Sequence, residues 1–185
     1  LMSATSWKFS RMRPAHFPDL RMVQLAALIR QVPKLMGLWM EAETPREAME
    51  QMEVQVQGYW TSHYRLDADS EQKKAKSLGR ATLHSLLINA AVPLLFLYGQ
   101  ERKQERWKEK SIDWLEKLPP ENNRILREWK KLDIRAENAA QSQALIYLKR
   151  FYCDERACLQ CSIGQKLMSE PFLGYFQNIH PQRSI

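Results

Sequence analysis

The sequence has few of the residues on which small β proteins and disulfide-bonded secreted domains depend. Six glycines and nine prolines among 185 residues are few for an all-β protein with many tight turns. Only three cysteines are present, and an odd number cannot form a framework in which every thiol is paired. Residues 1–18 lack an apolar core followed by a small-residue cleavage site, so no signal peptide is recognised. Unpaired thiols without an export signal predict a reducing, cytoplasmic setting.

The motifs that would identify several common enzyme classes are also missing. The sequence contains no P-loop, no GxGxxG, no GxSxG and no HExxH. This weighs against nucleotide hydrolysis, dinucleotide binding and zincin-type proteolysis, although it excludes no enzyme outright. A helix-hairpin-helix glycine pair and an RNP aromatic pattern are absent as well. The sequence by itself therefore assigns no activity.

The longest uncharged run, Ala81–Tyr98, reaches the length at which a membrane helix is considered. Polar and helix-bending residues interrupt it, namely Thr82, His84, Ser85, Asn89 and Pro93. A buried core helix explains this mixture better than a membrane span does. We therefore expect no membrane partner.

Hydrophobic spacing and helix-end signals predict an all-α protein with about six to eight helices. Asp19 could cap a first helix that Pro33 closes, and Thr44 with Glu47 forms a capping box before a helix that runs to Gly58. Gly99 is expected to end a helix that begins near Arg80. The expected helices cover about 20–32, 45–57, 80–97, 101–118, 121–131 and 137–152.

The remaining segments are expected to be irregular. Residues 1–18 are expected to form an extended N-terminal arm. In Gly58–Ser77 the aromatic residues are expected to form a loop packed on the core, and the polar stretch Asp67–Lys76 is expected to be exposed. No sustained strand alternation is present, and no linker is long enough to divide the chain. We therefore predict one compact helical domain over residues 1–185. In its last helix, 137–152, the predicted core-facing residues are Ala140, Ala144, Tyr147, Leu148 and Phe151.

All three cysteines lie together, as Cys153, Cys158 and Cys161, directly after that last predicted helix. Their C-x4-C-x2-C spacing includes a C-x2-C pair, in which two thiolates turn onto one metal ion. Gly164 permits a tight backbone beside the pair. The sequence therefore predicts a metal or thiol site in a cysteine loop over residues 153–164.

Three alternatives remain open for this loop. A structural zinc ion needs a fourth ligand, for which His180 is the candidate beside His63, His84 or an acidic side chain. An iron–sulfur cluster on three cysteines would leave one iron open to another ligand. The thiols could also hold no metal, and Cys158 and Cys161 could then form a local disulfide. The spacing differs from the C-x6-C-x2-C-x5-C loop of iron–sulfur DNA glycosylases.

A second group of chemically active residues lies near the N-terminus. Arg13 and Arg21 could hold carboxylates or phosphates in bidentate geometry, and His16 between them could be a ligand, an acid–base group or a cap. Alternatively, the prolines and Phe17 pack this segment onto the core while the arginines pair with the glutamates of 41–47. We predict Arg13, His16 and Arg21 as an anion- or partner-binding group.

The net charge of +7 is unevenly distributed. Residues 1–35 carry a net charge of +5, and residues 36–60 carry −4. The basic segment could contact the phosphates of a nucleic acid, an acidic partner or the acidic helix of the same domain. Nucleic acid therefore remains an alternative partner.

Five motifs carry a resemblance to a known family. They are RPAHFPxxR at 13–21, INxxVPLLFxYG at 88–99, LPxENN at 118–123, SQALI at 142–146 and YCx4Cx2CxIG at 152–164. In this order they resemble the C-terminal part of the bacterial DUF2851 proteins. The resemblance implies a longer parent protein, whose N-terminal part would be a partner of this chain, and it implies no activity. The family commonly has Asn where this chain has His16, which weighs against a catalytic role for that residue.

The sequence favours a non-catalytic helical module for protein–protein or interdomain contact, with a metal or thiol cluster near its C-terminus. Abundant core residues and the lack of a paired catalytic constellation support this hypothesis. A nucleic-acid-associated enzyme or its binding part is the first alternative, and an iron–sulfur enzyme domain is the second. Whether the protein is an enzyme stays open.

Metal analysis of protein purified without oxygen tests the prediction for the cysteine loop. A zinc site gives a stoichiometric metal content that falls when Cys161 is replaced by Ser, because a thiolate ligand is lost. An iron–sulfur cluster gives a brown colour and visible absorbance instead. Metal-free protein whose three thiols titrate freely would contradict both metal hypotheses.

Overall fold

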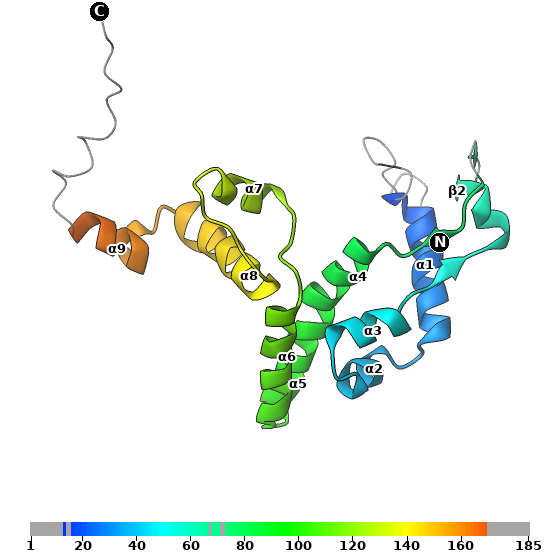
Figure 1. The fold of residues 1–185 in the computed structure, drawn as a ribbon, viewed down its shortest axis with the longest axis horizontal. Helices are drawn as coiled ribbons and strands as arrows, with labels where there is room; N and C mark the ends of the chain where they lie inside the picture. Colours follow the sequence, from blue (N-terminus) through cyan, green and yellow to red (C-terminus); the bar gives the residue numbers. More distant parts are fainter. Residues whose placement is uncertain (1–12, 14–15, 67, 71–72, 170–185) are drawn as a thin grey trace, which may run out of the picture. The chain divides into compact units, whose positions relative to one another are not determined.

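Helices dominate the computed structural model, which describes residues 13, 16–66, 68–70 and 73–169 (Figure 1). The all-α prediction is confirmed. Four short strands accompany the helices and pair as β1 with β4 and β2 with β3. Strands of two or three residues are too short to show the alternation by which a sequence reveals a strand.

The chain divides into two compact units, residues 1–119 and residues 120–185. The sequence favoured one helical domain, and this stays a prediction. The boundary falls between Pro119 and Pro120, where two rings without N–H groups prevent a helix from continuing. Each unit is therefore described by itself.

Unit 1 begins with α1 (Pro18–Gln31), and its start differs from the predicted one. Phe17 occupies the cap position, and Pro18 takes the first turn, where a missing N–H costs nothing. Asp19 was expected to cap the helix, but its carboxylate instead accepts a hydrogen bond from the Leu66 backbone N–H at 3.2 Å. Asp19 thus ties α1 to a distant loop.

The capping box at Thr44 is confirmed at the start of α3 (Pro45–Gln51), which follows α2 (Leu35–Glu41). The Thr44 hydroxyl accepts from the Glu47 N–H at 3.1 Å. The Glu47 carboxylate accepts in return from the Glu43 N–H at 2.8 Å, one residue before the usual position. This helix ends well before Gly58, because the chain beyond it becomes extended and enters β1.

Strand β1 (Gln55–Val56) pairs antiparallel with β4 (Lys76–Ser77), with Val56 opposite Lys76. Between them lie the 3₁₀ turn η3 (Gly58–Thr61) and the strands β2 (His63–Arg65) and β3 (Ala68–Asp69), which also pair antiparallel. The segment predicted as an irregular loop is therefore a small strand-paired substructure.

One long helical run crosses unit 1 from Arg80 to Glu101. It consists of α4 (Arg80–Leu86), the π turn η4 (Leu87–Ala91) and α5 (Val92–Glu101). The π turn lies just before Pro93, which cannot donate to the carbonyl four residues earlier. By length and composition this is the one helix among the described residues that could cross a membrane, and a third of its most apolar window is buried.

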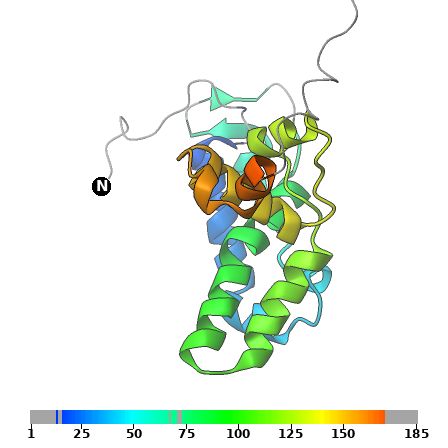
Figure 2. The same cartoon turned by 90° about the vertical axis from the view of Figure 1, so that its left-hand side faces the viewer.

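Gly99 does not end this helix as the sequence suggested, and its role is close packing. A Cβ at this position would lie 2.9 Å from Lys108 Cγ and 3.0 Å from the Gln104 carbonyl oxygen. Here α5 and α6 (Glu105–Lys117) run side by side as a hairpin (Figures 1 and 2). Leu95 of α5 and Trp114 of α6 are completely buried, so the hairpin supplies much of the unit 1 core.

Unit 2 contains α7 (Arg124–Lys130), α8 (Ala139–Leu148) and α9 (Ser162–Ser169). Asn123 and Asn138 cap the first two helices with their side-chain oxygens. The π turn η5 (Lys149–Cys153) extends α8, and the 3₁₀ turn η6 (Cys158–Gln160) precedes α9.

The buried face of α8 differs from the predicted one. Ala139, Ser142 and Ile146 are buried, whereas the predicted core residues Tyr147 and Phe151 are 55% and 58% exposed. Both faces recur at helical spacing, so periodicity alone could not decide between them. The helix buries Ala139, Ser142 and Ile146 and leaves Tyr147 outside, and Phe151 of η5 is also exposed.

We predict that Gly99→Ala destabilises the protein by roughly 1–3 kcal/mol, because a methyl group would push α5 away from α6. Gly37→Ala is the matched control, since its Cβ would meet nothing nearer than Lys34 Cβ at 3.6 Å. That helical substitution should leave stability unchanged or raise it by about 0.5–1 kcal/mol. Denaturant unfolding measures both, and equal effects would contradict the close approach at Gly99.

Candidate functional site

The structure brings together two of the three residues predicted near the N-terminus. An Arg21 guanidinium nitrogen lies 2.9 Å from His16 Nδ1, and since guanidinium can only donate, the imidazole nitrogen accepts. A second guanidinium nitrogen donates to the Gln24 side chain at 3.0 Å. Arg21 thus contacts neighbours on its own segment rather than the glutamates of 41–47, which was the alternative expectation.

Arg21 and His16 line a pocket of about 330 Å³ within unit 1. The third predicted residue, Arg13, is exposed and is not among the residues that line the pocket. Its carbonyl oxygen accepts from the His16 N–H at 2.8 Å. Arg13 therefore helps to place His16 through the backbone.

Two lysines that the sequence did not single out, Lys74 and Lys76, also line this pocket. Neither Asp nor Glu occurs among the described residues that line it. Three cationic side chains therefore share a small space, and no carboxylate in the described lining neutralises them. We call this set of Arg21, Lys74 and Lys76, with His16, the basic pocket.

Lys76 is buried, with only 5% of its surface exposed, although the sequence placed it in an exposed polar stretch. Its ammonium group donates to the Thr61 carbonyl at 2.7 Å and to the Lys74 carbonyl at 3.2 Å. It also lies 4.2 Å from the centre of the Tyr64 ring, a favourable cation–π contact. Burial lowers the pKa of Lys76, and burial likewise lowers the pKa of Arg21.

The side chain of Gln24 ties the basic pocket together. It is 2% exposed, and its amide nitrogen donates to the Ser77 carbonyl at 3.0 Å while its oxygen accepts from Arg21. Gln24 therefore connects α1 to β4, the strand that carries Lys76. A polar residue in the middle of an apolar helix face was the available signal for this contact.

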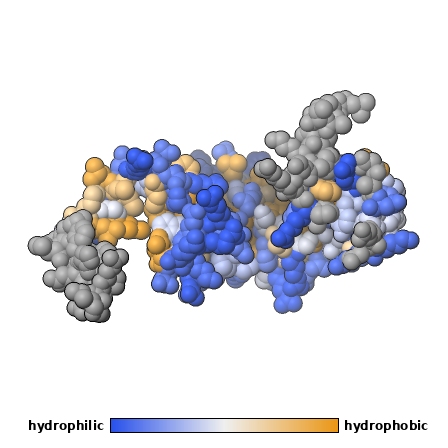
Figure 3. Space-filling view, turned by 90° about the horizontal axis from the view of Figure 1, so that it is seen from above, coloured by the Kyte–Doolittle hydropathy of each residue, from blue (hydrophilic) through white to orange (hydrophobic). Residues whose placement is uncertain are grey.

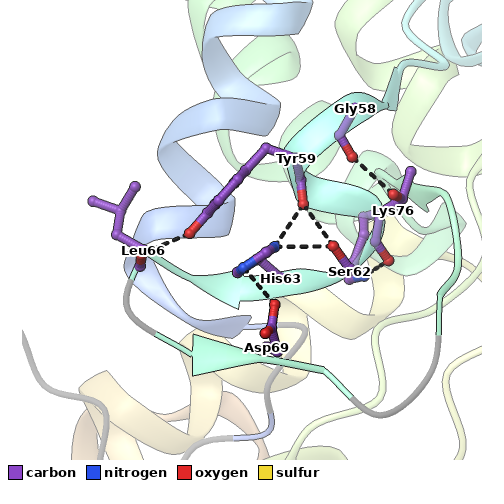
Figure 4. Close-up of polar contacts among 8 residues, drawn as sticks. Gly58, Tyr59, Ser62, His63, Leu66, Asp69 and Lys76 are labelled. Atoms are coloured by element: carbon purple, nitrogen blue, oxygen red, sulfur yellow. Dashed lines mark hydrogen bonds and ion pairs between the residues drawn. The ribbon is translucent and has the colours of Figure 1, made fainter.

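A Ser–His–Asp arrangement lies in the neighbouring strand pair (Figure 4). His63 Nε2 lies 2.7 Å from the Asp69 carboxylate, and His63 Nδ1 lies 3.0 Å from the Ser62 hydroxyl. The same Nδ1 is 2.8 Å from the Tyr59 carbonyl oxygen, and the Tyr59 ring stacks on the imidazole at 3.7 Å.

This arrangement does not make Ser62 a nucleophile. The Ser62 hydroxyl donates to the Tyr59 carbonyl oxygen at 3.3 Å. A nucleophilic serine needs its hydroxyl hydrogen directed at a base, and here that hydrogen is directed at a backbone carbonyl. The contacts instead hold β2 against β3 and Tyr59.

The cysteine loop of unit 2 places Cys153 and Cys158 on the surface and leaves Cys161 partly buried, all three with free thiols. No three His, Cys, Asp or Glu side chains gather into a metal-binding group within the described part of the chain. His180, the proposed fourth ligand, lies outside the described residues. The metal hypotheses therefore stay predictions.

Gly164 is required where α9 approaches η6. A Cβ at this position would overlap the carbonyl group of Cys158, and backbone at that distance cannot shift aside cheaply. The sequence expectation of tight backbone beside the cysteines agrees with this geometry.

A larger groove of about 700 Å³ lies in unit 2. Its lining carries no charged side chain among the described residues and consists of Gln143, Ala144, Tyr147, Leu148, Tyr152, Gln160, Cys161, Ser162 and Ile163. Tyr147 contacts Phe151 and Tyr152, with ring centres 4.5 Å and 6.2 Å apart. Hydrophobic residues gather on the surface of this unit (Figure 3). We call this feature the aromatic groove.

The buried Lys76 predicts a pH effect on stability. The pKa of Lys76 is lower in the folded protein than in the unfolded chain. As the pH rises toward 10.5, the folded protein therefore loses this proton first, and the unfolded chain holds more protons than the folded protein. The free energy of unfolding should rise with pH in that window. Lys76→Met keeps the volume and removes this contribution. The stability of the wild type relative to Lys76→Met should therefore improve as the pH rises toward 10.5 in urea unfolding.

The control for this experiment is Lys130→Met, at an exposed position of unit 2. Its stability relative to the wild type should stay constant over the same pH range, because the substitution leaves Lys76 and its surroundings unchanged. If the difference in stability between the wild type and Lys76→Met also stayed constant with pH, the conclusion that burial lowers the pKa of Lys76 would be contradicted.

Comparison with known proteins identifies a family but no function. The family described as a protein of unknown function, DUF2851, matches residues 1–124. Two of the motifs that carried the resemblance, at 142–146 and 152–164, lie beyond the matched range. No curated protein and no solved structure matches the chain. With two thirds of its length matched, the chain belongs to the DUF2851 family.

Proposed function

We propose that the protein is a helical interaction module that binds an amphipathic helix of another protein in the aromatic groove. The observation that carries this proposal is the outward position of Tyr147 of α8, which lines the groove at 55% exposure, with Phe151 of η5 beside it at 58% exposure. Exposed aromatic rings lose the stabilisation of roughly 25 cal/mol for each Å² that burial would give. A partner that covers them would recover it.

The shape and lining of the groove suit a helix. Its volume of about 700 Å³ lies in the range of specific binding sites. Tyrosine is enriched at the centres of protein interfaces, because it offers a large rigid surface with one polar atom. Apolar residues on one face of a partner helix would enter between Tyr147, Tyr152 and Ile163 as in other helix-in-groove complexes.

The charges around the groove indicate an acidic partner. The described part of unit 2 has nine lysines and arginines against six acidic residues. Arg150, Arg156 and Lys166 lie near the groove in sequence, while Lys149 already pairs with Asp154. Opposite charges at the rim of an interface speed association and orient the partner.

The groove is better suited to binding than to catalysis. Nucleophilic side chains of its described lining are Cys161, Ser162 and the two tyrosines, and neither His nor a carboxylate is among the described residues that line the groove beside them. Activation of a hydroxyl or thiol normally needs such a neighbour. The protein's own turnover of a substrate in this groove would contradict the proposal.

A photo-crosslinking amino acid at position 147 tests the proposal in cells that make the protein naturally. We expect it to capture a defined protein, and crosslinked peptides should lie on an amphipathic acidic helix. The purified partner should then bind the wild-type chain. Replacing Tyr147 with Ala should weaken this binding by about tenfold or more, as expected for an interface aromatic residue.

Ile112→Ala in unit 1 is the control, since Ile112 is 48% exposed and does not line the groove. It should leave binding unchanged. A crosslink to a second copy of the chain, or to its own residues 170–185, would identify a different occupant and overturn the proposal. Equal effects of Tyr147→Ala and Ile112→Ala would do the same.

A further inference from the structure

We propose that the basic pocket of unit 1 binds the phosphate group of a small molecule. This site is separate from the aromatic groove of unit 2, because the two sets of lining residues share no member. It is formed by α1, by β4 with the residues before it and by the start of α4. The argument rests on the charge, the donors and the size of the pocket.

The charge of the pocket favours a doubly charged anion. Arg21, Lys74 and Lys76 bring three positive charges, and the described lining contains no carboxylate. A phosphate monoester carries about −1.5 to −2 at pH 7, whereas a carboxylate carries one negative charge. The phosphate therefore compensates more of the local charge. Its binding would also offset the cost of burying Lys76 as a cation, which the lowered pKa reflects.

The donors in the pocket suit the oxygens of a phosphate group. Arg21 has five N–H donors, and its contacts to His16 and Gln24 use two guanidinium nitrogens without exhausting them. Those contacts fix the guanidinium plane, which favours a bidentate contact to phosphate. Tyr64 and Thr82, which each carry a hydroxyl group, also line the pocket.

The start of the helical run at Arg80 adds to this environment. Gly79, which lines the pocket, provides no capping side chain. The first amides of a helix lack partners within the helix, and its dipole favours negative charge there. In the 22-residue run Arg80–Glu101, this contribution supplements the three cationic side chains.

The size of the pocket sets the class of ligand. A volume of about 330 Å³ is at the lower end for small-molecule sites. It accommodates a phosphate with a small substituent. An extended nucleic acid would instead need a row of cations along a surface, so a small phosphate-bearing molecule fits the observations better.

Isothermal titration calorimetry on the whole chain at constant ionic strength tests this inference. The probes are inorganic phosphate, glycerol 3-phosphate, acetate and a short DNA duplex. We expect both phosphate compounds to bind and acetate to bind at least about tenfold more weakly, because it carries one charge. Tighter binding of glycerol 3-phosphate identifies an esterified ligand, and equal binding identifies free phosphate; both support the site.

Arg21→Gln and Lys74→Met should each weaken phosphate binding by about tenfold or more, as expected for losing a charge-assisted contact. Arg30→Gln is the matched control, because Arg30 is exposed on the same helix and does not line the pocket. It should bind phosphate as the wild type does. Circular dichroism confirms that each variant is folded, and Lys74, being exposed, is the safer substitution.

Three results would overturn the inference. The first is a wild-type chain that binds neither phosphate compound. The second is an equal loss of binding in Arg30→Gln and Arg21→Gln, which would indicate general surface electrostatics. The third is binding of the DNA duplex that depends on Arg21 while the small phosphates do not bind. Phosphate binding is measured independently of the protein partner, so failure here leaves the proposed interaction at the aromatic groove unaffected.

Discussion

The pairing of β1 with β4 is the constraint on which the basic pocket depends. Val56 lies opposite Lys76, and both are buried, while their neighbours Gln55 and Ser77 are exposed. Because side chains alternate along a strand, a register slip of one residue would turn Lys76 outward. It would also move the Ser77 carbonyl away from Gln24, the residue that orients Arg21. The two residue pairs of this strand pairing thus determine whether Lys76 and Arg21 line the same pocket.

The sequence predicted local structure well and distant pairing poorly. The contact between Thr44 and Glu47 spans three residues, so spacing alone predicts it. The pairing of Val56 with Lys76 spans twenty residues, and each strand has only two residues. Gly99 is a second example of a distant contact that the sequence did not predict. The sequence suggested that this glycine ends a helix, whereas in the structure it is required because α6 approaches closely.

In the basic pocket, too, the residues that are close in sequence were predicted and the distant ones were not. His16 and Arg21 are five residues apart, and the chemistry of their side chains directed attention to both. Lys74 and Lys76 come from a polar stretch more than fifty residues later, which nothing in the sequence connected to Arg21. The cysteines, in contrast, are close together in the sequence. Neighbours in sequence need not converge on one point, and within the described residues no three ligands do.

Helix α8 explains why unit 2 presents an aromatic surface. Its buried positions are occupied by Ala139, Ser142 and Ile146, and the Ser142 hydroxyl donates to the Ala139 carbonyl at 2.9 Å and accepts from the Glu121 N–H at 3.3 Å. Small residues allow close approach of neighbouring backbone, which leaves no room for a ring on that face.

Tyr147 of α8 consequently lies outside this buried face, and the π turn η5 continues the helix toward Cys153 with Phe151 and Tyr152. A π turn adds one residue to a helical turn, so it changes which side chains after Leu148 share a face. Phe151 and Tyr152 can thereby both approach Tyr147. Tyr147 and Phe151 are exposed and Tyr152 is half-buried, so the interaction proposed above would cover rings that the internal packing of α8 leaves at the surface.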